Sequence, residues 1–395
     1  MRARGLSDQP AIETQAVKLL HLIVDDKFID MAIREFEGVA PGQHEWMILG
    51  DGTQRKFVKD TRVRCVDWDG FARAVVAPDV GAVVCHVMTP THLAALSRVP
   101  AHLQVVWLGW GYDYYGLIND AFPQGLLQPA TAALSAQLAA PSPEVAEQCA
   151  VPSVLGHARP YRRPSAKERD ALARVDIFSP VIDTEYHLVR RHLPGFTARY
   201  VRWNYGTTED DFMLPGATLG APGRNILAGN SATATNNHLE LFDHIRRSGD
   251  LADRLIVTPL SYGDARYRAC VIESGRALFG DAIVPLVDFL PKDRYIELLA
   301  SCGHVMMNHV RQQALGNLVI SGLMGATLHL APANPLFNWL RSIGVPVRDI
   351  NSREFAPSSP AERSAQVEAL QREFGRSAQR ARTLTLVDAA LTPRA

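Results

Sequence analysis

The sequence lacks the cysteine spacings that mark metal sites and disulfide frameworks. Its five cysteines lie at positions 65, 85, 149, 270 and 302, and no two of them form a CxxC pair. An odd number of cysteines in a long chain does not suggest a disulfide framework, so we expect a protein of the reducing cytoplasm. We also expect no metal site.

Excess charge and long apolar runs are absent as well. The net charge is zero, so no overall field draws the chain to nucleic acid. The first ten residues, MRARGLSDQP, are polar, and no apolar run long enough for a signal peptide or a membrane span follows them. Any contact with the inner face of the cell membrane is therefore expected to be peripheral.

What is present is the pattern of an α/β protein with two domains. A chain of 395 residues exceeds the usual size of one hydrophobic core. Short runs rich in valine and isoleucine alternate with helical stretches, which is typical of parallel sheets covered by helices on both faces. These runs lie at 18–24, 46–49, 81–88, 104–108, 174–178, 224–228, 254–258, 283–287, 304–308 and 326–330.

The domain boundaries follow from composition. The stretch 206–224 is rich in Gly, Pro and Thr and has no sustained period, so it is interpreted as the interdomain linker. We predict an N-terminal domain at 1–215, a second domain at 216–359 and a C-terminal helical segment at 360–395. The strand pattern stops beyond Pro346, and 360–385 resembles one solvent-facing helix.

Polar loops follow the predicted strands of the second half. Ligands of open parallel sheets bind outside the carboxyl ends of the strands, so these loops are expected at one edge. They comprise Gly229, Asn230 and Ser231; the run 259–263 with Tyr262; the run 309–317; and the run 332–338 with Asn334 and Phe337.

The loop 309–317 has the features of a diphosphate cradle. It offers Arg311, Gln312, Gln313 and Gly316, and a helix is expected to begin near Asn317, where free N–H groups favour an anion. A second helix should be capped by Thr235 or Asn236. There is no GxxxxGK[ST] and no GxGxxG after a strand, which excludes a P-loop and disfavours a redox dinucleotide. A nucleotide sugar remains as the ligand, bound as a substrate without a further cofactor.

The first half supplies candidate acid–base groups. The strand 18–24 runs into Asp25 and Asp26, and the strand 104–108 runs into the loop WGYDYY at 110–115. Carboxylates at strand ends are suited to take a proton from an attacking sugar hydroxyl, and the aromatic rings beside them to stack on a sugar. We predict Asp113 as the best candidate base, with Asp26 as a second candidate. His309 is a third catalytic candidate, because an imidazole can offset charge on a leaving diphosphate.

Four motifs resemble the TDP-N-acetylfucosamine:lipid II N-acetylfucosaminyltransferase family of bacterial glycan assembly. WGYDYY resembles its WGxDxY, LAGNSATATNNH at 227–238 its VGNS block with a following Asn and His, RQQALGNL at 311–318 its RQQxxGTL, and NPLFNW at 334–339 its NPFW. The resemblance extends over nearly the whole chain, with the landmarks in order. It implies a GT-B fold, with two facing Rossmann-like domains, the donor in the C-terminal one and no metal.

The resemblance also implies the substrates. The donor would be a dTDP-sugar of the 4-amino-deoxysugar type, and the acceptor a lipid-diphosphate-linked glycan of surface polysaccharide synthesis. The residues that it places on the donor side are Asn230, Ser231, Asn236, His238, Arg311, Gln312, Gln313, Gly316 and Asn317.

The sequence departs from the family pattern in places. Asn237 stands where the family tends to have an acidic residue, and Ala314 and Asn317 replace a glycine and a threonine, so the accepted sugar is expected to differ. The basic run 157–170 is either a solvated helix entry or a contact with anionic headgroups. Two other functions fit the same features: a nucleotide-sugar epimerase of the same fold, and a nucleotide-sugar-binding subunit without chemistry.

Overall fold

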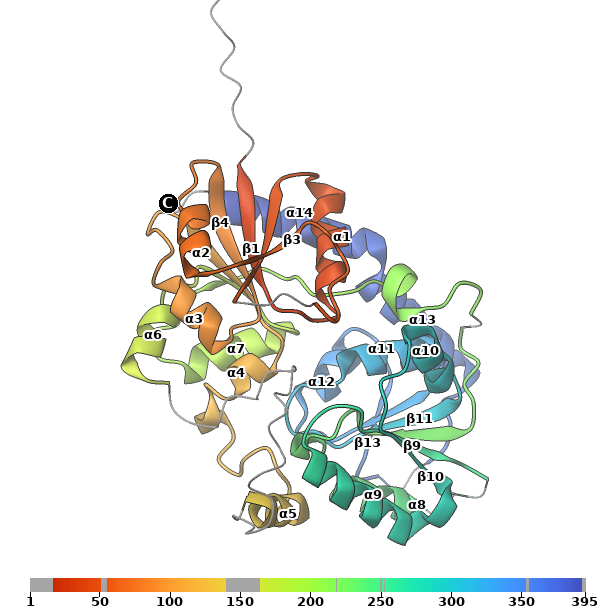
Figure 1. Cartoon of the computed structure of the whole chain (residues 1–395). Helices are drawn as coiled ribbons and strands as arrows, with labels where there is room; N and C mark the ends of the chain where they lie inside the picture. The colour runs from red at the N-terminus through yellow and green to blue at the C-terminus, as the bar shows by residue number, and fades with distance from the viewer. Residues whose placement is uncertain are drawn as a thin grey trace, which may run out of the picture.

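The computed structural model describes residues 17–50, 55–139, 164–217, 219–248, 251, 253–352 and 355–392. They form two parallel α/β lobes (Figure 1). Arg159, Arg162 and Arg163 of the basic run lie outside the described residues, whereas Lys167 is exposed on α6.

The N-terminal lobe is built on a seven-stranded sheet in the order β3-β2-β1-β4-β5-β6-β7. Successive side chains of β1 point to opposite faces of the sheet, and both faces are buried. Leu20 and Leu22 pack into one apolar cluster, and Leu19 and Ile23 pack into the cluster on the other face. The strands are β1 (Lys18–Ile23), β2 (His44–Leu49), β3 (Val63–Val66), β4 (Val80–His86), β5 (Gln104–Leu108), β6 (Ile177–Ser179) and β7 (Arg199–Tyr200).

The C-terminal lobe has a six-stranded sheet in the order β10-β9-β8-β11-β12-β13, again entirely parallel. Because parallel strands share one carboxyl edge, the loops after β8, β9, β11 and β12 meet there. The strands are β8 (Asn225–Ala228), β9 (Ile256–Pro259), β10 (Ile283–Leu286), β11 (Cys302–Met307), β12 (Thr327–Leu330) and β13 (Val347–Asp349).

The helices cover both faces of each sheet, as the apolar clusters show. In the first half of the chain they are α1 (Ile29–Val39), α2 (Trp68–Val75), α3 (Pro90–Leu96), α4 (Tyr112–Tyr115), α5 (Pro129–Ala139), α6 (Ala166–Leu172) and α7 (Asp183–His192). Those that follow are α8 (His238–Ser248), α9 (Ala265–Phe279), α10 (Lys292–Ala300), α11 (Leu315–Leu323), α12 (Pro335–Ser342), α13 (Pro360–Phe374) and α14 (Arg376–Leu391). No helix within the described ranges is long and apolar enough to cross a membrane.

Two segments pack on the lobe opposite to the one that precedes them in the chain. Helix α5 leaves the first lobe and lies beside α8 and α9, where Leu134 and Leu138 join the apolar cluster of the second lobe (Figure 1). Helix α14 returns to the first lobe, where Leu386 and Ala390 pack into the cluster that includes α1. The lobes are therefore joined by more than the segment between β7 and β8.

Two expectations about the end of the fold are wrong. Strand β13 lies beyond Pro346, where the sequence pattern predicted no further strand; its three residues are all only partly buried, so they carry no apolar alternation. The predicted single solvent-facing helix is two helices, and both have buried faces, for example Val367 and Leu370 on α13. Each helix has many polar residues and only a narrow stripe of apolar ones, which explains why the sequence suggested a solvent-facing helix.

Candidate active site

Asn236 organises the loop after β8. Its Oδ1 accepts the backbone N–H of Asn230 at 2.8 Å, and its Nδ2 donates to the carbonyl oxygens of Ser231 and Thr233, each at 3.0 Å. The expected capping of the next helix by Thr235 or Asn236 is wrong: a 3₁₀ turn ends at Asn236, and α8 begins two residues later. The side chain thus shapes the loop instead of the helix.

Gly229 opens this loop in a left-handed conformation, with φ of +70°. A Cβ there would lie 2.8 Å from Oδ1 of Asn236 and 2.9 Å from Nε2 of His238, which is too close for any side chain. Glycine is therefore required at this position both by the backbone and by the neighbouring polar groups.

Hydrogen bonds join three of the predicted loops. Nε2 of Gln313, in the loop after β11, donates to Oδ1 of Asn230 at 2.8 Å, and Oε1 of Gln313 accepts the hydroxyl of Thr235 at 2.8 Å. Nδ2 of Asn230 donates to the hydroxyl of Tyr262, in the loop after β9, at 3.0 Å. Residues predicted separately from three loops thus form one polar cluster at the carboxyl edge of the sheet.

Two buried histidines border this cluster. Nε2 of His309 lies 2.9 Å from Oδ1 of Asn236, and Nδ1 of His238 lies 3.1 Å from the hydroxyl of Tyr267. Burial lowers the pKa of His238 to about 3 and lowers the pKa of His309 well below its usual value. Both rings are therefore neutral near pH 7, and in this conformation His309 does not supply the positive charge that we expected of it.

Each histidine also has a buried ring nitrogen without a hydrogen-bond partner among the described residues, Nδ1 of His309 and Nε2 of His238. Buried polar atoms are nearly always paired in native proteins. Unpaired atoms that flank one polar cluster indicate a place where a ligand or water completes the hydrogen bonds.

Helix α11 begins two residues earlier than the sequence predicted. Ala314 takes a left-handed conformation with φ of +64°, and the helix starts at Leu315, so that Gly316 and Asn317 lie in its first turn. No side chain in the described part of the chain caps this N-terminus. A Cβ added at Gly316 would have a ring carbon of Phe212, 3.9 Å away, as its nearest neighbour, so the backbone is open to close approach. These features favour an anion.

Among the described residues, neither Asn334 nor Phe337 makes a hydrogen bond or a ring contact with the polar cluster. Asn334 caps α12 by accepting the N–H of Leu336 at 2.9 Å, and its Nδ2 is buried without a partner in the described part of the chain. Phe337 packs into the core of the second lobe, with the guanidinium of Arg341 over its ring. Their predicted roles in donor binding stay predictions.

Arg311 and Gln312 face the first lobe. The backbone N–H of Gln312 donates to the hydroxyl of Tyr115 at 3.0 Å, and the guanidinium of Arg311 lies 5.8 Å from the centre of the Tyr115 ring. The loop after β11 thus touches both the polar cluster of the second lobe and the opposite lobe.

The carboxylate of Asp113 is turned into the protein. It is 1% exposed and accepts hydrogen bonds from the backbone N–H of Met88, Nε1 of Trp107 and the backbone N–H of Trp110, all at 2.8–2.9 Å. Burial still raises its pKa, against the effect of these donors. In this conformation Asp113 holds the loop in place, and the geometry does not support its expected role as the base.

The aromatic rings of this loop are also less available than expected. Tyr114 and Tyr115 are fully buried, so they cannot stack on a sugar as placed. Trp110 and Tyr112 are half-buried, and the Trp110 ring meets that of Phe28 edge-on at 5.4 Å. These two rings are the parts of WGYDYY that remain near the surface.

Asp25 and Asp26 serve different purposes. Both oxygens of Asp25 accept backbone N–H groups, from Lys56, Phe57 and Val58, which ties the loop after β2 to the end of β1. Oδ1 of Asp26 accepts the N–H of Phe28 at 3.0 Å. Burial raises the pKa of Asp26, the direction expected for a carboxylate poised to accept a proton.

Sequence reasoning missed two residues that border this region. Lys27 lies with its ammonium 5.4 Å from the ring centre of Phe28 and 5.9 Å from that of Tyr262, so it reaches from the first lobe to the polar cluster of the second. Its position next to Asp26 is the only signal that could have found it. Glu185, on α7, is fully buried, and no local motif marks it.

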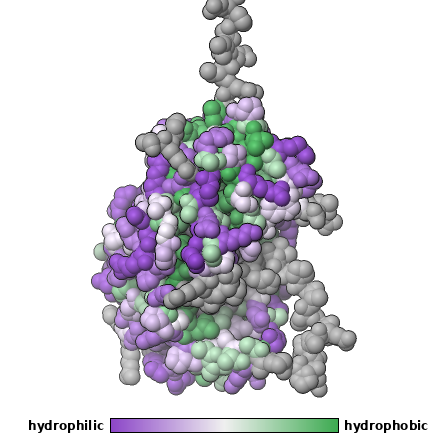
Figure 2. All heavy atoms as spheres, turned by 90° about the vertical axis from the view of Figure 1, so that its left-hand side faces the viewer, coloured by the Kyte–Doolittle hydropathy of each residue, from purple (hydrophilic) through white to green (hydrophobic). Residues whose placement is uncertain are grey.

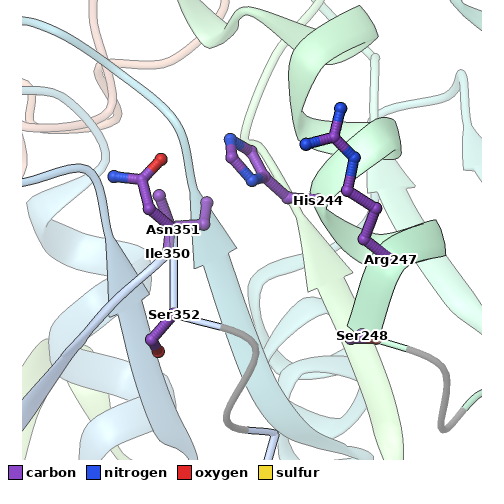
Figure 3. A pocket seen from close by; sticks show the side chains of 6 residues that line it. All are labelled: His244, Arg247, Ser248, Ile350, Asn351 and Ser352. Atoms are coloured by element: carbon purple, nitrogen blue, oxygen red, sulfur yellow. The ribbon is translucent and has the colours of Figure 1, made fainter.

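The structure also contains two hollows away from these loops. One, of about 150 Å³, lies between α8 and the segment after β13; Figure 3 shows His244 and Arg247 on one side and Asn351 on the other. A larger one, of about 430 Å³, is lined by the starts of β8, β11 and β12. Neither is lined by a predicted site residue. Among the described residues no group of three or more His, Cys, Asp or Glu side chains could hold a metal ion.

Part of the sequence matches a known family of glycosyltransferases. Residues 209–372 match the family described as 4-alpha-L-fucosyltransferase, glycosyl transferase group 56. The matched range contains the polar cluster and the loop before α11. It confirms the resemblance for the motifs at 227–238, 311–318 and 334–339, whereas WGYDYY at 110–115 lies outside the matched range.

Solved structures are similar over nearly the whole chain. HepE of Anabaena, in complex with UDP and glucose, is 11% identical with a TM-score of 0.61, covering 94% of this chain and 100% of that one. An α,α-trehalose-phosphate synthase (UDP-forming) from Burkholderia vietnamiensis is 12% identical with a TM-score of 0.59, covering 96% and 100%. A trehalose-6-phosphate structure from E. coli, bound with UDP-2-fluoro glucose, is 9% identical with a TM-score of 0.62, covering 95% and 100%.

At such low identities these structures show the fold alone, which is GT-B, as the sequence predicted. The family match adds the reaction class and favours transfer over epimerisation or binding without chemistry. The chain is a glycosyltransferase with two facing α/β lobes, and its residues 209–372 match glycosyl transferase group 56.

Proposed function

We propose that the chain transfers a 4-amino-deoxysugar from a dTDP-sugar to a lipid-diphosphate-linked glycan during bacterial surface polysaccharide synthesis. The observation that carries the donor side of this proposal is the polar cluster of Asn230, Gln313 and Tyr262, which adjoins the uncapped N-terminus of α11. We place the reaction in the cytoplasm, at the inner face of the cell membrane.

In the proposed step, the acceptor hydroxyl attacks the anomeric carbon of the donor while the bond to the diphosphate oxygen breaks. The proton of the hydroxyl passes to Asp26, and dTDP leaves with the electron pair of the broken bond. The free N–H groups of the first turn of α11 and the backbone at Gly316 stabilise the charge that develops on the diphosphate. No metal is needed in this scheme.

One feature favours Asp26 over Asp113 as the base: Oδ1 of Asp26 accepts the N–H of Phe28, whereas Asp113 accepts hydrogen bonds from three donors. Burial raises the pKa of both carboxylates, and a base with a raised pKa accepts a proton more readily near neutral pH, so the pKa suits Asp26 to this role without separating it from Asp113.

A UDP-sugar is the second candidate donor. HepE was solved with UDP, and another structure of the same fold with UDP-2-fluoro glucose. The family resemblance favours dTDP, because its donor is a dTDP-sugar. The two nucleotides differ only at the pyrimidine ring and the ribose, so both suit the same diphosphate cradle.

Thermal-shift measurement with dTDP, UDP, GDP and CMP tests the donor class. A ligand at 100 times its Kd stabilises the folded state by about 2.7 kcal/mol, so we expect dTDP to raise the melting temperature of a chain of this length by roughly 3 °C. The shift should be lost in Gln313→Ala and kept in Asn351→Ala, an exposed amide far from the cluster. Stabilisation by UDP alone would show that the donor nucleotide is uridine diphosphate instead of dTDP. Stabilisation by none of the four nucleotides would reject the site.

A further inference from the structure

Tyr115 clamps the loop after β11 from the opposite lobe. Its hydroxyl accepts a hydrogen bond from the backbone N–H of Gln312 at 3.0 Å. The carbonyl oxygen of Gln312 accepts a second hydrogen bond, from Nη1 of Arg311, at 2.8 Å. The side chain of Gln312 fits against Gly111, where a Cβ would lie only 2.7 Å from Oε1. Both backbone polar groups of Gln312 are thus hydrogen-bonded, whereas Oε1 of its side chain is buried without a partner among the described residues.

The clamp has a buried carboxylate behind it. Glu185, on α7, accepts the hydroxyl of Tyr114 at 2.6 Å and the N–H of Ile182 at 3.3 Å, and its charge also acts on the hydroxyl of Tyr115. Arg311 is the charged group that acts on it from the second lobe. The chain of contacts therefore runs from Glu185 through Tyr115 to the backbone of the loop after β11.

The orientation of the Tyr115 hydroxyl follows from its two neighbours, Glu185 and Gln312. An ionised Glu185 attracts the proton of the Tyr115 hydroxyl, which turns the lone pairs of the phenolic oxygen toward the N–H of Gln312. Residue Gln313, which bonds Asn230 in the donor-side cluster, directly follows the clamped residue. A shift of the Gln312 peptide would therefore move the donor side.

We propose that Tyr115, oriented by Glu185, is a positioning residue of the first lobe that holds the donor loop of the second lobe in the conformation that binds the nucleotide diphosphate. This inference rests on the proposed function for its ligand but not for the clamp itself. It assigns to WGYDYY a role at the donor loop that is separate from acceptor binding.

Glu185 makes the clamp sensitive to pH. Its burial raises the pKa to about 7, although the hydroxyls of Tyr114 and Tyr115, the N–H of Ile182 and the charge of Arg311 all oppose the increase. As the pH falls through 7, Glu185 takes up a proton and no longer attracts the Tyr115 hydroxyl as strongly. The clamp should therefore weaken on the acid side.

Hydrogen exchange of the ligand-free protein tests the clamp without any nucleotide. In Tyr115→Phe we expect the protection of residues 309–316, corrected for intrinsic exchange, to fall about tenfold. The matched control is Tyr186→Phe, which removes another buried hydroxyl, one that donates to the carbonyl of Ala198 at 3.0 Å, and should leave the loop unchanged. Equal protection in the wild type and Tyr115→Phe overturns the proposal.

The pH dependence separates positioning from mere packing. Loop protection in the wild type should fall between pH 8 and pH 6, whereas Glu185→Gln, which keeps the size but cannot ionise, should show a flat profile. A decrease that persists in Glu185→Gln overturns the role of Glu185.

Nucleotide binding completes the test. The Kd for dTDP should rise about tenfold in Tyr115→Phe, while Tyr186→Phe binds as the wild type does. If the loop loosens but the Kd stays unchanged, the clamp does not serve the donor and the proposal fails. If the wild type binds no nucleotide diphosphate at all, the proposed function fails, and the exchange results still decide on the clamp.

Discussion

Residues of the same type have distinct tasks in the first lobe because their surroundings differ. Asp113 is enclosed by three hydrogen-bond donors, and Asp25 by three backbone N–H groups, so each carboxylate secures a loop. Asp26 bonds Phe28 and has a raised pKa through burial. Sequence reasoning saw three carboxylates at strand ends, but the direction of each side chain depends on neighbours far along the chain.

Asp26→Asn should lower turnover by roughly 10²- to 10⁴-fold, the usual contribution of a general base. The affinity for dTDP should be unchanged, because the substitution lies outside the polar cluster of the second lobe. Steady-state kinetics and nucleotide titration measure the two effects separately.

The pH dependence of kcat/KM tests whether Asp26 acts in its ionised form. Burial raises its pKa, so the ionised form that acts as a base is lost as the pH falls through that raised value, and kcat/KM should decrease on the acid side. Asp113→Asn is the comparison: it should lower stability, because an amide nitrogen would meet one of three donors. Equal catalytic loss with retained stability in Asp113→Asn would contradict this assignment.

At the scale of elements, α5 is the part of the first half that packs on the second lobe. Glu240 of α8 accepts the backbone N–H of Ala130 and Thr131 at the start of α5, at 2.7 and 3.0 Å. The side chains of Gln128 and Asn308 exchange two hydrogen bonds at 3.0 and 3.1 Å. The segment before α5 is therefore a fixed connection between the lobes.

Asn237 explains one departure from the family pattern. Its Oδ1 accepts the N–H of Gln128, and its Nδ2 donates to the carbonyl oxygens of Leu126 and Asn308 at 3.2 and 3.0 Å. An acidic residue cannot make the two donations. The amide thus suits the connection to α5, whereas we had expected the difference to bear on the sugar.

Asn237→Asp should therefore destabilise the protein by about 1–3 kcal/mol or more, since two buried carbonyls would face a carboxylate. Urea unfolding measures the change. Asn225→Asp is the matched control, because its Oδ1 can still accept the N–H of Leu255 and its Nδ2 partner, the hydroxyl of Ser301, can turn and donate to a carboxylate. Equal losses in the two variants would refute the explanation.

The elements differ in how well the sequence predicts them. The ten short apolar runs are all strands or overlap strands, because burial on both faces leaves a plain signal. Strands β3, β7 and β13 lie at sheet edges and are mostly exposed or half-buried, so no apolar run marks them. The packing of α5 and α14 on the other lobe depends on long-range contacts that no local pattern contains.

At the scale of the whole molecule, the linker between the sheets is held by charges from both lobes. Asp211 pairs with Arg34 of α1, and Lys292 of α10 lies 3.8 Å from it. Asp210 accepts two hydrogen bonds from Arg376 of α14, at 2.9 and 2.8 Å. The predicted linker thus contains a π-helical turn, Thr208–Phe212, that is tied to both sides. The domain limits at 215 and 359 stay predictions.

The surface gives no broad apolar band on the face that Figure 2 shows, where hydrophobic side chains are scattered among hydrophilic ones. The polar cluster of Asn230, Gln313 and Tyr262 was predictable as a group of strand-end loops, because glycine and amide residues at strand ends form recognisable motifs. The clamp by Tyr115 and Glu185 was not, since it joins loops 197 residues apart in the chain.

The release of dTDP from a set of dTDP-linked 4-amino-deoxysugars, with and without a lipid-diphosphate-linked glycan acceptor, tests the central claim most directly. The account predicts release that depends on the acceptor, matched by a labelled sugar on the lipid fraction. Conversion of the donor to another nucleotide sugar without acceptor, or binding of the donor with neither release nor transfer, would contradict it.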